Sequence, residues 1–328
     1  MILQPRAILL VVALVATAAP PAGAQTAAPA AGPSGTATQS TTSIPDFSGI
    51  WSHPSFPGFE PPASGPGPVV NKARRPQGAG IDGRTLPPNN NILVSNPARL
   101  IGDYSNPILK PQAAEIVKKH GEMEVSGAGS PTPTIQCWPE PVPYIFNGVA
   151  MVMLQRSDRI TFLYPNDHQV RHVRMNVPHP AKVAPSWYGD SVGHYEGDEL
   201  VIDTVGIKHG RFSMIDWFGT PYTEALHLVE RYRLLDHDAT MKAVAWAAKE
   251  HSQTDNPGSG PRPDPNYRGK GLQIQLTVED TGTFTMPWTA TLTFRRALDE
   301  WSELVCAENI QWHPGTYSEA PTADKPDF

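Results

Sequence analysis

The sequence is poor in cysteine and lacks the short motifs that mark nucleotide-binding and acyl-transfer sites. Its 328 residues include only Cys137 and Cys306, and neither stands in a C-x-x-C pair, so a zinc or thiol redox site is not expected. No Walker loop and no G-x-G-x-x-G fingerprint is present. Residues 189–193 read Gly-Asp-Ser-Val-Gly, but they lead into a predicted strand and not into a helix, so Ser191 is not predicted to be a nucleophile.

The chain also lacks an excess of basic charge. It carries 26 lysines and arginines against 32 aspartates and glutamates, for a formal net charge of −6. Arg6 lies in a segment that we expect to be removed, which leaves 25 basic residues and a net charge of −7 with neutral histidines. Because the basic residues form no cluster, the sequence offers no electrostatic surface suited to nucleic acid, and nucleic acid is not an expected partner.

Long apolar runs are absent except at the N-terminus. Arg6 precedes an apolar run at residues 7–16, and a small-x-small site ends at Ala24, which together predict a secretory signal peptide over residues 1–24. The run is shorter than the roughly 20 apolar residues that span a bilayer, and no later stretch is long enough. We therefore predict a periplasmic or secreted protein with no membrane insertion after cleavage.

Export into an oxidising compartment bears on the two cysteines. We expect a disulfide between Cys137 and Cys306, with two separate buried thiols as the alternative. Residues 25–43 contain no large apolar side chain, so they cannot offset chain entropy by burial and are predicted to form a disordered linker. The remaining residues, 44–328, are predicted to form one β-rich domain with a loop insertion at residues 250–271.

Alternating apolar and polar residues predict strands through the second half of the chain. Residues 158–175 and 191–205 each read as a β-hairpin, the second with a two-residue Gly-Asp turn. Counting back from that turn places Ser191 opposite Thr204, and it puts Tyr195, Leu200 and Ile202 on the predicted core face. Further strands are predicted at residues 144–154, 226–235, 241–246, 272–280, 288–294 and 301–306.

Helix signals are scarce. Pro111 at a first helical turn, alanines after it, and Glu115 four residues before Lys119 predict one short helix near residues 111–120. Residues 52–108 are rich in proline and glycine and predict long loops. Strands joined by hairpins with almost no helix favour a mainly β fold, an antiparallel meander that closes into a barrel or packs as a sandwich.

Three charged residues fall among apolar neighbours. Glu230, Asp280 and Arg296 each share a face with the apolar residues of their own predicted strand. A buried carboxylate is costly unless it is paired, so we expect Glu230 and Asp280 to meet arginines. The available arginines are Arg171, Arg174, Arg231 and Arg296. Such a pair either braces the fold from inside or serves as a polar anchor or general acid/base in an apolar cavity, and both interpretations stay open.

Histidines are frequent in the same part of the chain but do not form a metal-binding pattern. They are His168, His172, His179, His194 and His227. No H-x-H or H-E-x-x-H spacing occurs among them, so neither a metal ion nor another cofactor is expected.

Two sets of motifs resemble known families. The start Phe47-x-Gly49-x-Trp51 resembles the first-strand signature of lipocalins and other calycin-like barrels, in which the tryptophan closes the barrel floor. Residues 189–204 (GDSVGHYEGDELVIDT) and 226–233 (LHLVERYR) resemble an exported bacterial β-rich family. These resemblances imply a lipocalin- or calycin-like barrel in an exported protein, and no particular activity.

Two functions fit a barrel with few inward polar groups. The first is an exported binding protein for a small, largely apolar molecule, such as an aromatic one, held inside the barrel. The alternative is a cofactor-free lyase, hydratase or isomerase acting on such a molecule, with His168 or His179 as general base and Glu230 or Asp280 as its partner. The residues expected to contact the ligand are Arg171, Arg174, Arg296 and Tyr232.

Overall fold

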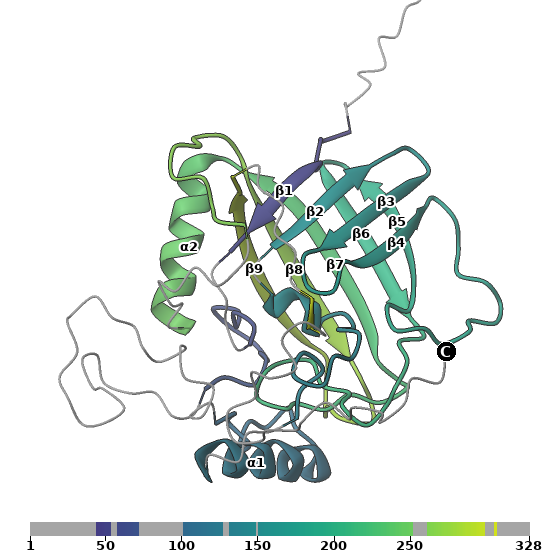
Figure 1. The fold of residues 1–328 in the computed structure, drawn as a ribbon, viewed down its shortest axis with the longest axis vertical. Coiled ribbons are helices and arrows are strands. Elements are labelled where there is room, and N and C mark those ends of the chain that lie inside the picture. The colour runs from purple at the N-terminus through teal and green to yellow at the C-terminus, as the bar shows by residue number, and fades with distance from the viewer. Residues whose placement is uncertain are drawn as a thin grey trace, which may run out of the picture. The chain divides into compact units, whose positions relative to one another are not determined.

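The computed structural model of this protein has a closed β-barrel at its centre (Figure 1). The signal peptide and linker predicted for residues 1–43 lie outside the described residues, as does most of the final strand predicted at 301–306. Val305 and Cys306, which are described, are not in a strand. The structure describes residues 44–53, 58–71, 101–126, 131–148, 150–251, 261–298 and 305–306.

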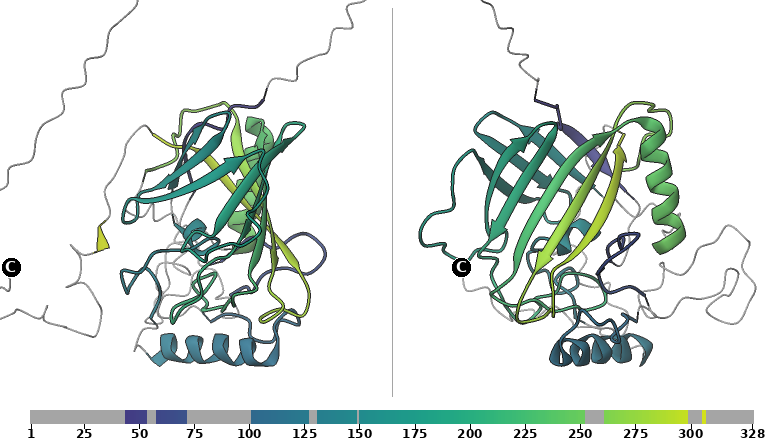
Figure 2. Two further views of the ribbon diagram at one scale, coloured as in Figure 1. Left: turned by 90° about the vertical axis from the view of Figure 1, so that its right-hand side faces the viewer. Right: turned by 180° about the vertical axis from the view of Figure 1, so that it is seen from behind.

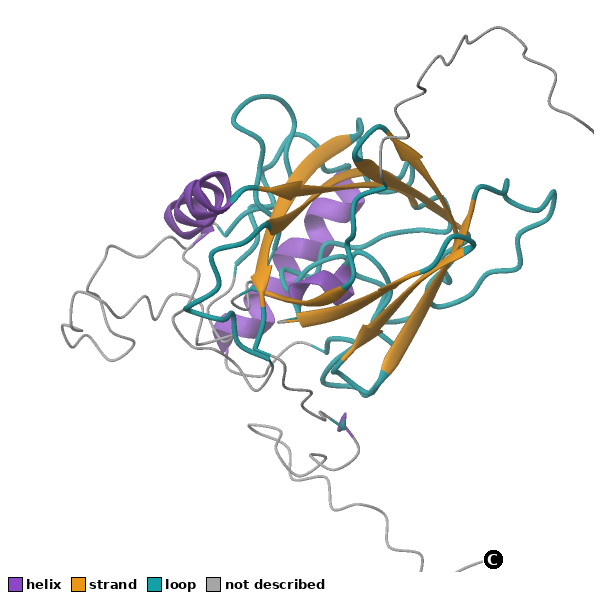
Figure 3. Ribbon diagram, turned by 90° about the horizontal axis from the view of Figure 1, so that it is seen from above, coloured by secondary structure: helices purple, strands orange, loops and turns teal. Residues whose placement is uncertain are grey.

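Nine strands form the barrel in the described part of the chain, and they follow one another around it in chain order. Antiparallel pairing of the first strand with the last closes the ring, which Figure 3 shows from above. The predicted mainly β fold and its closure into a barrel are confirmed. The strands are β1 (Gly49–Ser52), β2 (Ala150–Gln155), β3 (Arg159–Tyr164), β4 (Gln169–Met175), β5 (Asp190–Glu196), β6 (Glu199–Val205), β7 (His227–Leu235), β8 (Gly271–Glu279) and β9 (Trp288–Arg296).

The strand registers follow from the hairpin turns. In the β5–β6 hairpin Ser191 pairs with Thr204 and Glu196 with Glu199, as predicted. Gly197 adopts a φ of +63° in the turn, a conformation that glycine reaches without steric cost. Since successive side chains point to opposite faces, this register sends one set of side chains into the barrel and the other set outward.

One strand pair departs from the predicted antiparallel meander. β4 and β5 run parallel, from Val173 opposite Ser191 to Met175 opposite Gly193. Residues 176–189 carry the chain back along the barrel before β5 begins. A parallel pair needs such a crossover of a dozen or more residues, whereas an antiparallel pair needs only a short turn.

The predicted helix is confirmed and is longer than expected. Helix α1 (Pro111–Ser126) begins at the predicted proline and continues past Gly121. It lies beyond the end of the barrel at which β3 and β8 finish (Figure 1). We call this the α1 end of the barrel. The backbone N–H of Lys110 donates to the carbonyl of Thr283 at 2.9 Å, which ties the start of α1 to the β8–β9 loop.

The strand predicted at residues 241–246 is wrong, because this segment belongs to helix α2 (His237–His251). Asp236 caps the helix by accepting a hydrogen bond from a backbone N–H of the first turn at 2.7 Å. Thr240 and Ala247, seven residues apart, are both buried, which is the spacing of one helix face. The segment is rich in alanine, the strongest helix former, and α2 lies beside β9 on the outside of the barrel (Figure 2).

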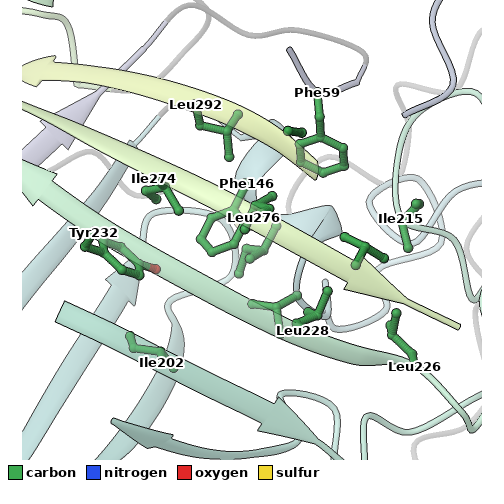
Figure 4. Packing of buried hydrophobic residues seen from close by; sticks show 14 of the residues in the cluster. Phe59, Phe146, Ile202, Ile215, Leu226, Leu228, Tyr232, Ile274, Leu276 and Leu292 are labelled. Atoms are coloured by element: carbon green, nitrogen blue, oxygen red, sulfur yellow. The ribbon is translucent and has the colours of Figure 1, made fainter. Parts of the chain in front are cut away.

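The continuous strand predicted at residues 144–154 is also wrong. A 3₁₀ helix, η2 (Tyr144–Asn147), occupies its first part, and Gly148 in an extended conformation ends that helix before β2 begins. All four side chains of η2 are buried, and Phe146 joins the apolar core inside the barrel (Figure 4). A short run that is apolar on all sides fits any fully buried element, so its periodicity alone does not identify a strand.

Trp51 of β1 contacts Arg296 of β9 and so joins the first strand to the last. The indole N–H of Trp51 donates to the carbonyl of Phe47 at 2.9 Å. The guanidinium carbon of Arg296 lies 5.2 Å from the centre of the Trp51 ring, and its Nη1 donates to the carbonyl of Ser48 at 2.7 Å. Arg296 therefore has the predicted apolar neighbour at the point where β1 pairs with β9. There its guanidinium packs against the face of an aromatic ring.

The predicted disulfide between Cys137 and Cys306 is present and joins residues 169 positions apart. The backbone N–H of Cys306 also donates to the carboxylate of Asp167 at 2.7 Å, so Cys306 is held at the β3–β4 turn. Among the described residues, no helix has the length and apolar character needed to cross a membrane.

We expect the disulfide to contribute strongly to stability. Replacing both cysteines, Cys137→Ser with Cys306→Ser, should lower the free energy of unfolding by up to about 5 kcal/mol, since the bridge restricts a long loop in the unfolded chain. Urea unfolding of the variant and of the oxidised wild type measures this difference. An unchanged urea midpoint would contradict the expectation.

Candidate functional site

A compact group of polar side chains lies among the apolar residues inside the barrel. We call it the interior cluster, and its members project inward from β4, β5, β6 and β7. All five are buried, with at most 3% of any residue exposed. The members of the interior cluster are Arg171, Ser191, Thr204, Glu230 and Tyr232.

The interior cluster is built on a buried ion pair between Arg171 and Glu230. Nη2 of Arg171 lies 2.6 Å from Oε1 of Glu230, and Nη1 lies 3.0 Å from Oε2, so the two groups meet through parallel hydrogen bonds. Neither side chain is exposed. Burial lowers the pKa of Arg171, but the charge of Glu230 and its hydrogen bonds outweigh this and hold the pKa above its usual value. The prediction that Glu230 meets an arginine is confirmed.

Hydroxyl groups of neighbouring side chains form further hydrogen bonds with the Arg171–Glu230 pair. Nε of Arg171 donates to Ser191 Oγ at 3.2 Å, and Nη2 donates to Thr204 Oγ1 at 2.8 Å. The Tyr232 hydroxyl donates to Oε2 of Glu230 at 2.6 Å. Burial and then the charge of Glu230 raise the pKa of Tyr232 well above its usual value, so this phenol stays protonated. The guanidinium and the carboxylate are thus fixed by several partners on different strands.

Strand alternation explains how residues far apart in the sequence meet here. On β7, Glu230 has the same parity as Leu228 and Tyr232, and all three are buried. Glu230 is flanked by Ile202 of β6 and Leu276 of β8 in the sheet. The cluster is therefore surrounded by apolar side chains, several of which Figure 4 shows. This environment is the physical reason that the carboxylate needs a charged partner.

Tyr164 lies beside the interior cluster and has a hydroxyl without a partner. Its ring stacks against Phe162 with centroids 6.3 Å apart, and Phe162 in turn lies 5.7 Å from the ring of Tyr232 and 5.5 Å from the Arg171 guanidinium. The Tyr164 hydroxyl is buried and has no hydrogen-bond partner among the described residues. Burial raises its pKa well above the usual value, so it is protonated at neutral pH.

Sequence reasoning missed Tyr164, although a signal was present. Tyr164 has the parity of Ile160 and Phe162 on β3, and this face is buried. A tyrosine on an apolar face carries a polar tip into the core and usually needs a partner there. The alternation of β3 therefore already marked Tyr164 as a polar group inside the barrel.

The structure places Arg174 and His179 outside the barrel, in a network that we call the outer chain. His179 comes from the crossover between β4 and β5. Both of its ring nitrogens contact carboxylates, Nδ1 at 2.6 Å from Asp190 and Nε2 at 2.9 Å from Asp203. The outer chain consists of Arg174, Asp190, His179, Asp203, His227 and Glu279, with successive contacts of 2.7, 2.6, 2.9, 3.0 and 3.4 Å.

His227 points away from the barrel interior, because it lies three residues before the inward-facing Glu230 on β7 and so has the opposite parity. Burial lowers its pKa, but the hydrogen bond and charge of Asp203, with those of Glu279, outweigh burial and hold the pKa above its usual value. Because Asp203 contacts both His179 and His227, it links the crossover to β7 on the outer face of the sheet. The outer chain thus fastens the crossover to the barrel.

The remaining predicted site residues also lie apart from the interior cluster. His168 is exposed in the β3–β4 turn. Asp280 follows β8 and, contrary to expectation, meets no arginine among the described residues; it accepts hydrogen bonds from the N–H and the hydroxyl of Thr223 at 2.6 and 2.7 Å. These hydrogen bonds take the place of the expected ion pair. Of the predicted residues, the structure brings together Arg171, Glu230 and Tyr232.

Two buried carboxyl groups in the loops at the α1 end were not predicted. Glu140 accepts a hydrogen bond from the Thr134 hydroxyl at 2.6 Å, and burial raises its pKa to about 7. Asp216 is fully buried, accepts the backbone N–H of Thr220 at 3.1 Å, and burial raises its pKa to about 7. Irregular loops have no periodicity from which burial can be read, so the sequence gives no sign of these two groups.

Within the described ranges, no three His, Cys, Asp or Glu side chains converge in a way that could hold a metal ion. Comparison of the chain with models of protein families, with curated proteins and with solved structures finds no match. The assignment of a function therefore depends on the geometry and chemistry of the residues themselves.

Removing the charge of Glu230 should destabilise the fold. Glu230→Gln leaves Arg171 buried without a counterion, and we expect a loss of about 3–5 kcal/mol in the free energy of unfolding. The matched control is Glu199→Gln, because Glu199 contacts Arg231 in a partly exposed pair that contributes about 1 kcal/mol or less. Urea unfolding at pH 7 measures both changes.

A double variant separates the cost of an unpaired charge from the loss of the pair itself. Replacing both partners by apolar residues, Arg171→Met with Glu230→Leu, leaves no buried charge, and such replacements are often close to neutral. We expect the double variant to be more stable than Glu230→Gln. A double variant that is less stable than this single variant would contradict the electrostatic explanation.

Stability should fall between mildly acidic and neutral pH. The pKa values of Glu140 and Asp216 rise on folding from 4.5 and 3.8 to about 7, so the folded state binds these protons more tightly than the unfolded state. Their contribution is greatest below pH 4 and is lost as the pH rises to 7. His227 acts in the same direction, since its stabilisation is complete below pH 6.5 and is lost through its raised pKa. Burial lowers the pKa of His120 to about 4, so this residue acts in the opposite direction between pH 4 and 6.5 and offsets one of the two acids.

The pH dependence is measured as the melting temperature between pH 4.5 and 7.5. Glu140→Gln and Asp216→Asn replace each buried acid by a neutral analogue and should flatten the profile. Glu115→Gln, on the exposed side of α1, is the control and should leave the profile unchanged. A profile equally steep with both buried acids replaced would show that other groups cause it.

Proposed function

We propose that this protein is an exported binding protein that holds a small, largely apolar molecule inside its β-barrel. The observation that carries the proposal is the composition of the interior, where apolar side chains surround one compact polar cluster that is balanced in charge. Binding sites for small molecules have this composition, mostly apolar walls with a few well-placed polar groups. Closed barrels of about this size hold small ligands in several protein classes.

The aromatic side chains support a preference for a planar apolar molecule. Phe162, Tyr164 and Tyr232 form a run of neighbouring rings along the inner wall, and the Arg171 guanidinium lies against the first of them. Aromatic rings gain stabilisation from stacked or edge contacts with other rings beyond the area that they bury. An aromatic ligand would make such contacts with this wall.

The interior cluster supports binding because its polar groups are already positioned. Ser191, Thr204 and Tyr232 hold both members of the ion pair, so the pair does not need to reorganise when a ligand arrives. A wall that is fixed before binding loses less conformational freedom on binding, and affinity increases accordingly.

The location outside the cytoplasm is supported by two features. The N-terminal sequence has the order of basic, apolar and small residues found in secretory signals. The disulfide between Cys137 and Cys306 is of the kind that forms in oxidising compartments.

The acid–base alternative has less support from the geometry. It needs His168 or His179 close to Glu230 or Asp280. His179 lies on the outer face with Asp190 and Asp203, whereas Glu230 lies inside and is occupied by Arg171. A proton transfer between these groups would have to cross the wall of the barrel, so we do not propose this reaction.

The test is binding of naphthalene to the purified protein, followed by tryptophan fluorescence and calorimetry. We expect saturable binding with a stoichiometry of one. Phe162→Leu removes a ring from the inner wall and should weaken binding about two- to tenfold, the equivalent of one aromatic contact. Leu154→Ala, on the outer face of β2, is the control and should leave affinity unchanged. No saturable binding, or equal losses in both variants, would contradict the proposal.

A further inference from the structure

We infer that the molecule bound in the barrel is uncharged and carries one hydrogen-bond acceptor, such as a carbonyl oxygen, which the Tyr164 hydroxyl recognises. This inference rests on the proposed binding function and adds the chemical class of the ligand. It also assigns a specificity-determining role to Tyr164, which is outside the hydrogen-bonded interior cluster.

The first support is that Arg171 is already occupied. Both terminal nitrogens contact the carboxylate of Glu230, and Nε and Nη2 also donate to the hydroxyls of Ser191 and Thr204. An anionic ligand beside this pair would either displace Glu230 or add a second negative charge next to a single guanidinium. In both cases one carboxylate is buried without a counterion, which is strongly unfavourable. Arg171 therefore does not serve as an anion-binding residue here.

The second support is the state of the Tyr164 hydroxyl. It is the polar tip of a residue with 2% of its surface exposed, and it has no hydrogen-bond partner among the described residues. Its charged neighbour Arg171 offers only donors, so it cannot accept the phenolic proton. A buried donor without an acceptor is costly, and an acceptor on the ligand would remove that cost.

The third support is position. Tyr164 is the last residue of β3, at the α1 end of the barrel, and its ring continues the aromatic wall of Phe162 and Tyr232. A planar ligand whose body lies against this wall would present an acceptor at its edge to the Tyr164 hydroxyl. The same phenol is protonated at neutral pH because burial raises its pKa, so it acts as a donor.

The experiment uses three naphthalene derivatives of similar size that differ in one group. 2-Acetylnaphthalene is neutral and has an acceptor, 2-ethylnaphthalene is neutral and has none, and 2-naphthoate is an anion at pH 7. Each is titrated into the wild type, into Tyr164→Phe and into Tyr195→Phe. Tyr195 is the matched control because its hydroxyl already contacts Gln155, on a different part of the barrel.

We expect the wild type to bind 2-acetylnaphthalene about two- to tenfold more tightly than 2-ethylnaphthalene, which is the effect of one net hydrogen bond. 2-Naphthoate should bind at least about tenfold more weakly than the acetyl compound, since its charge finds no free counterion. Tyr164→Phe should abolish the preference for the acetyl compound and leave binding of the ethyl compound unchanged. Tyr195→Phe should keep the preference.

Stability of the ligand-free variants gives a second readout. If Tyr164 only braced the core, Tyr164→Phe would lower the urea midpoint; we expect an equal or higher midpoint, because an unpaired buried hydroxyl is removed. Equal affinity for the acetyl and ethyl compounds, tightest binding of 2-naphthoate, or a preference that survives in Tyr164→Phe would overturn the inference while leaving the proposed function in place. If none of the three compounds binds, the proposed function fails, and the inference fails with it.

Discussion

Closure of the sheet decides which side chains of this protein can act together. In a closed barrel each strand sends alternate residues inward and outward, so neighbours in the sequence are separated by the wall. Arg171 and Arg174 lie three residues apart on β4, yet the first meets Glu230 inside and the second meets Asp190 outside. The interior cluster and the outer chain are consequences of this single constraint, since both draw on the same strands.

The ion pair inside the barrel shapes the site more than it stabilises the fold. A buried pair recovers little more than the cost of removing both charges from water, and its value is often specificity. Here Arg171 and Glu230 join β4 to β7. Their opposite charges cancel, and the other members of the interior cluster are neutral hydroxyl groups. The Tyr164 hydroxyl beside this pair is one of several buried polar groups among the described residues that have no hydrogen-bond partner.

The loops at the α1 end make the stability of the fold depend on pH. Glu140 and Asp216 are held in segments without regular structure, and burial raises the pKa of each to about 7. The disulfide joins Cys306 to Cys137, and the hydrogen bond to Asp167 holds Cys306 at the β3–β4 turn. Two buried acids there make the fold responsive to pH near neutrality, because each must lose its proton in a site with little solvent.

Local periodicity in the sequence determined most of the strands, the register of the β5–β6 hairpin, the start of α1 and the inward orientation of Glu230, although it assigned helix α2 and the 3₁₀ helix η2 to strands. These features depend on neighbours a few residues away, and the sequence contains those neighbours. The pairing of Glu230 with Arg171, 59 positions away, required an inward arginine on another strand, and four arginines were compatible with the sequence. Only closure of the barrel selected among them. It also separated His179 from Glu230, satisfied Asp280 through Thr223, and buried Glu140 and Asp216, because contacts between distant segments depend on how the strands and loops pack in space.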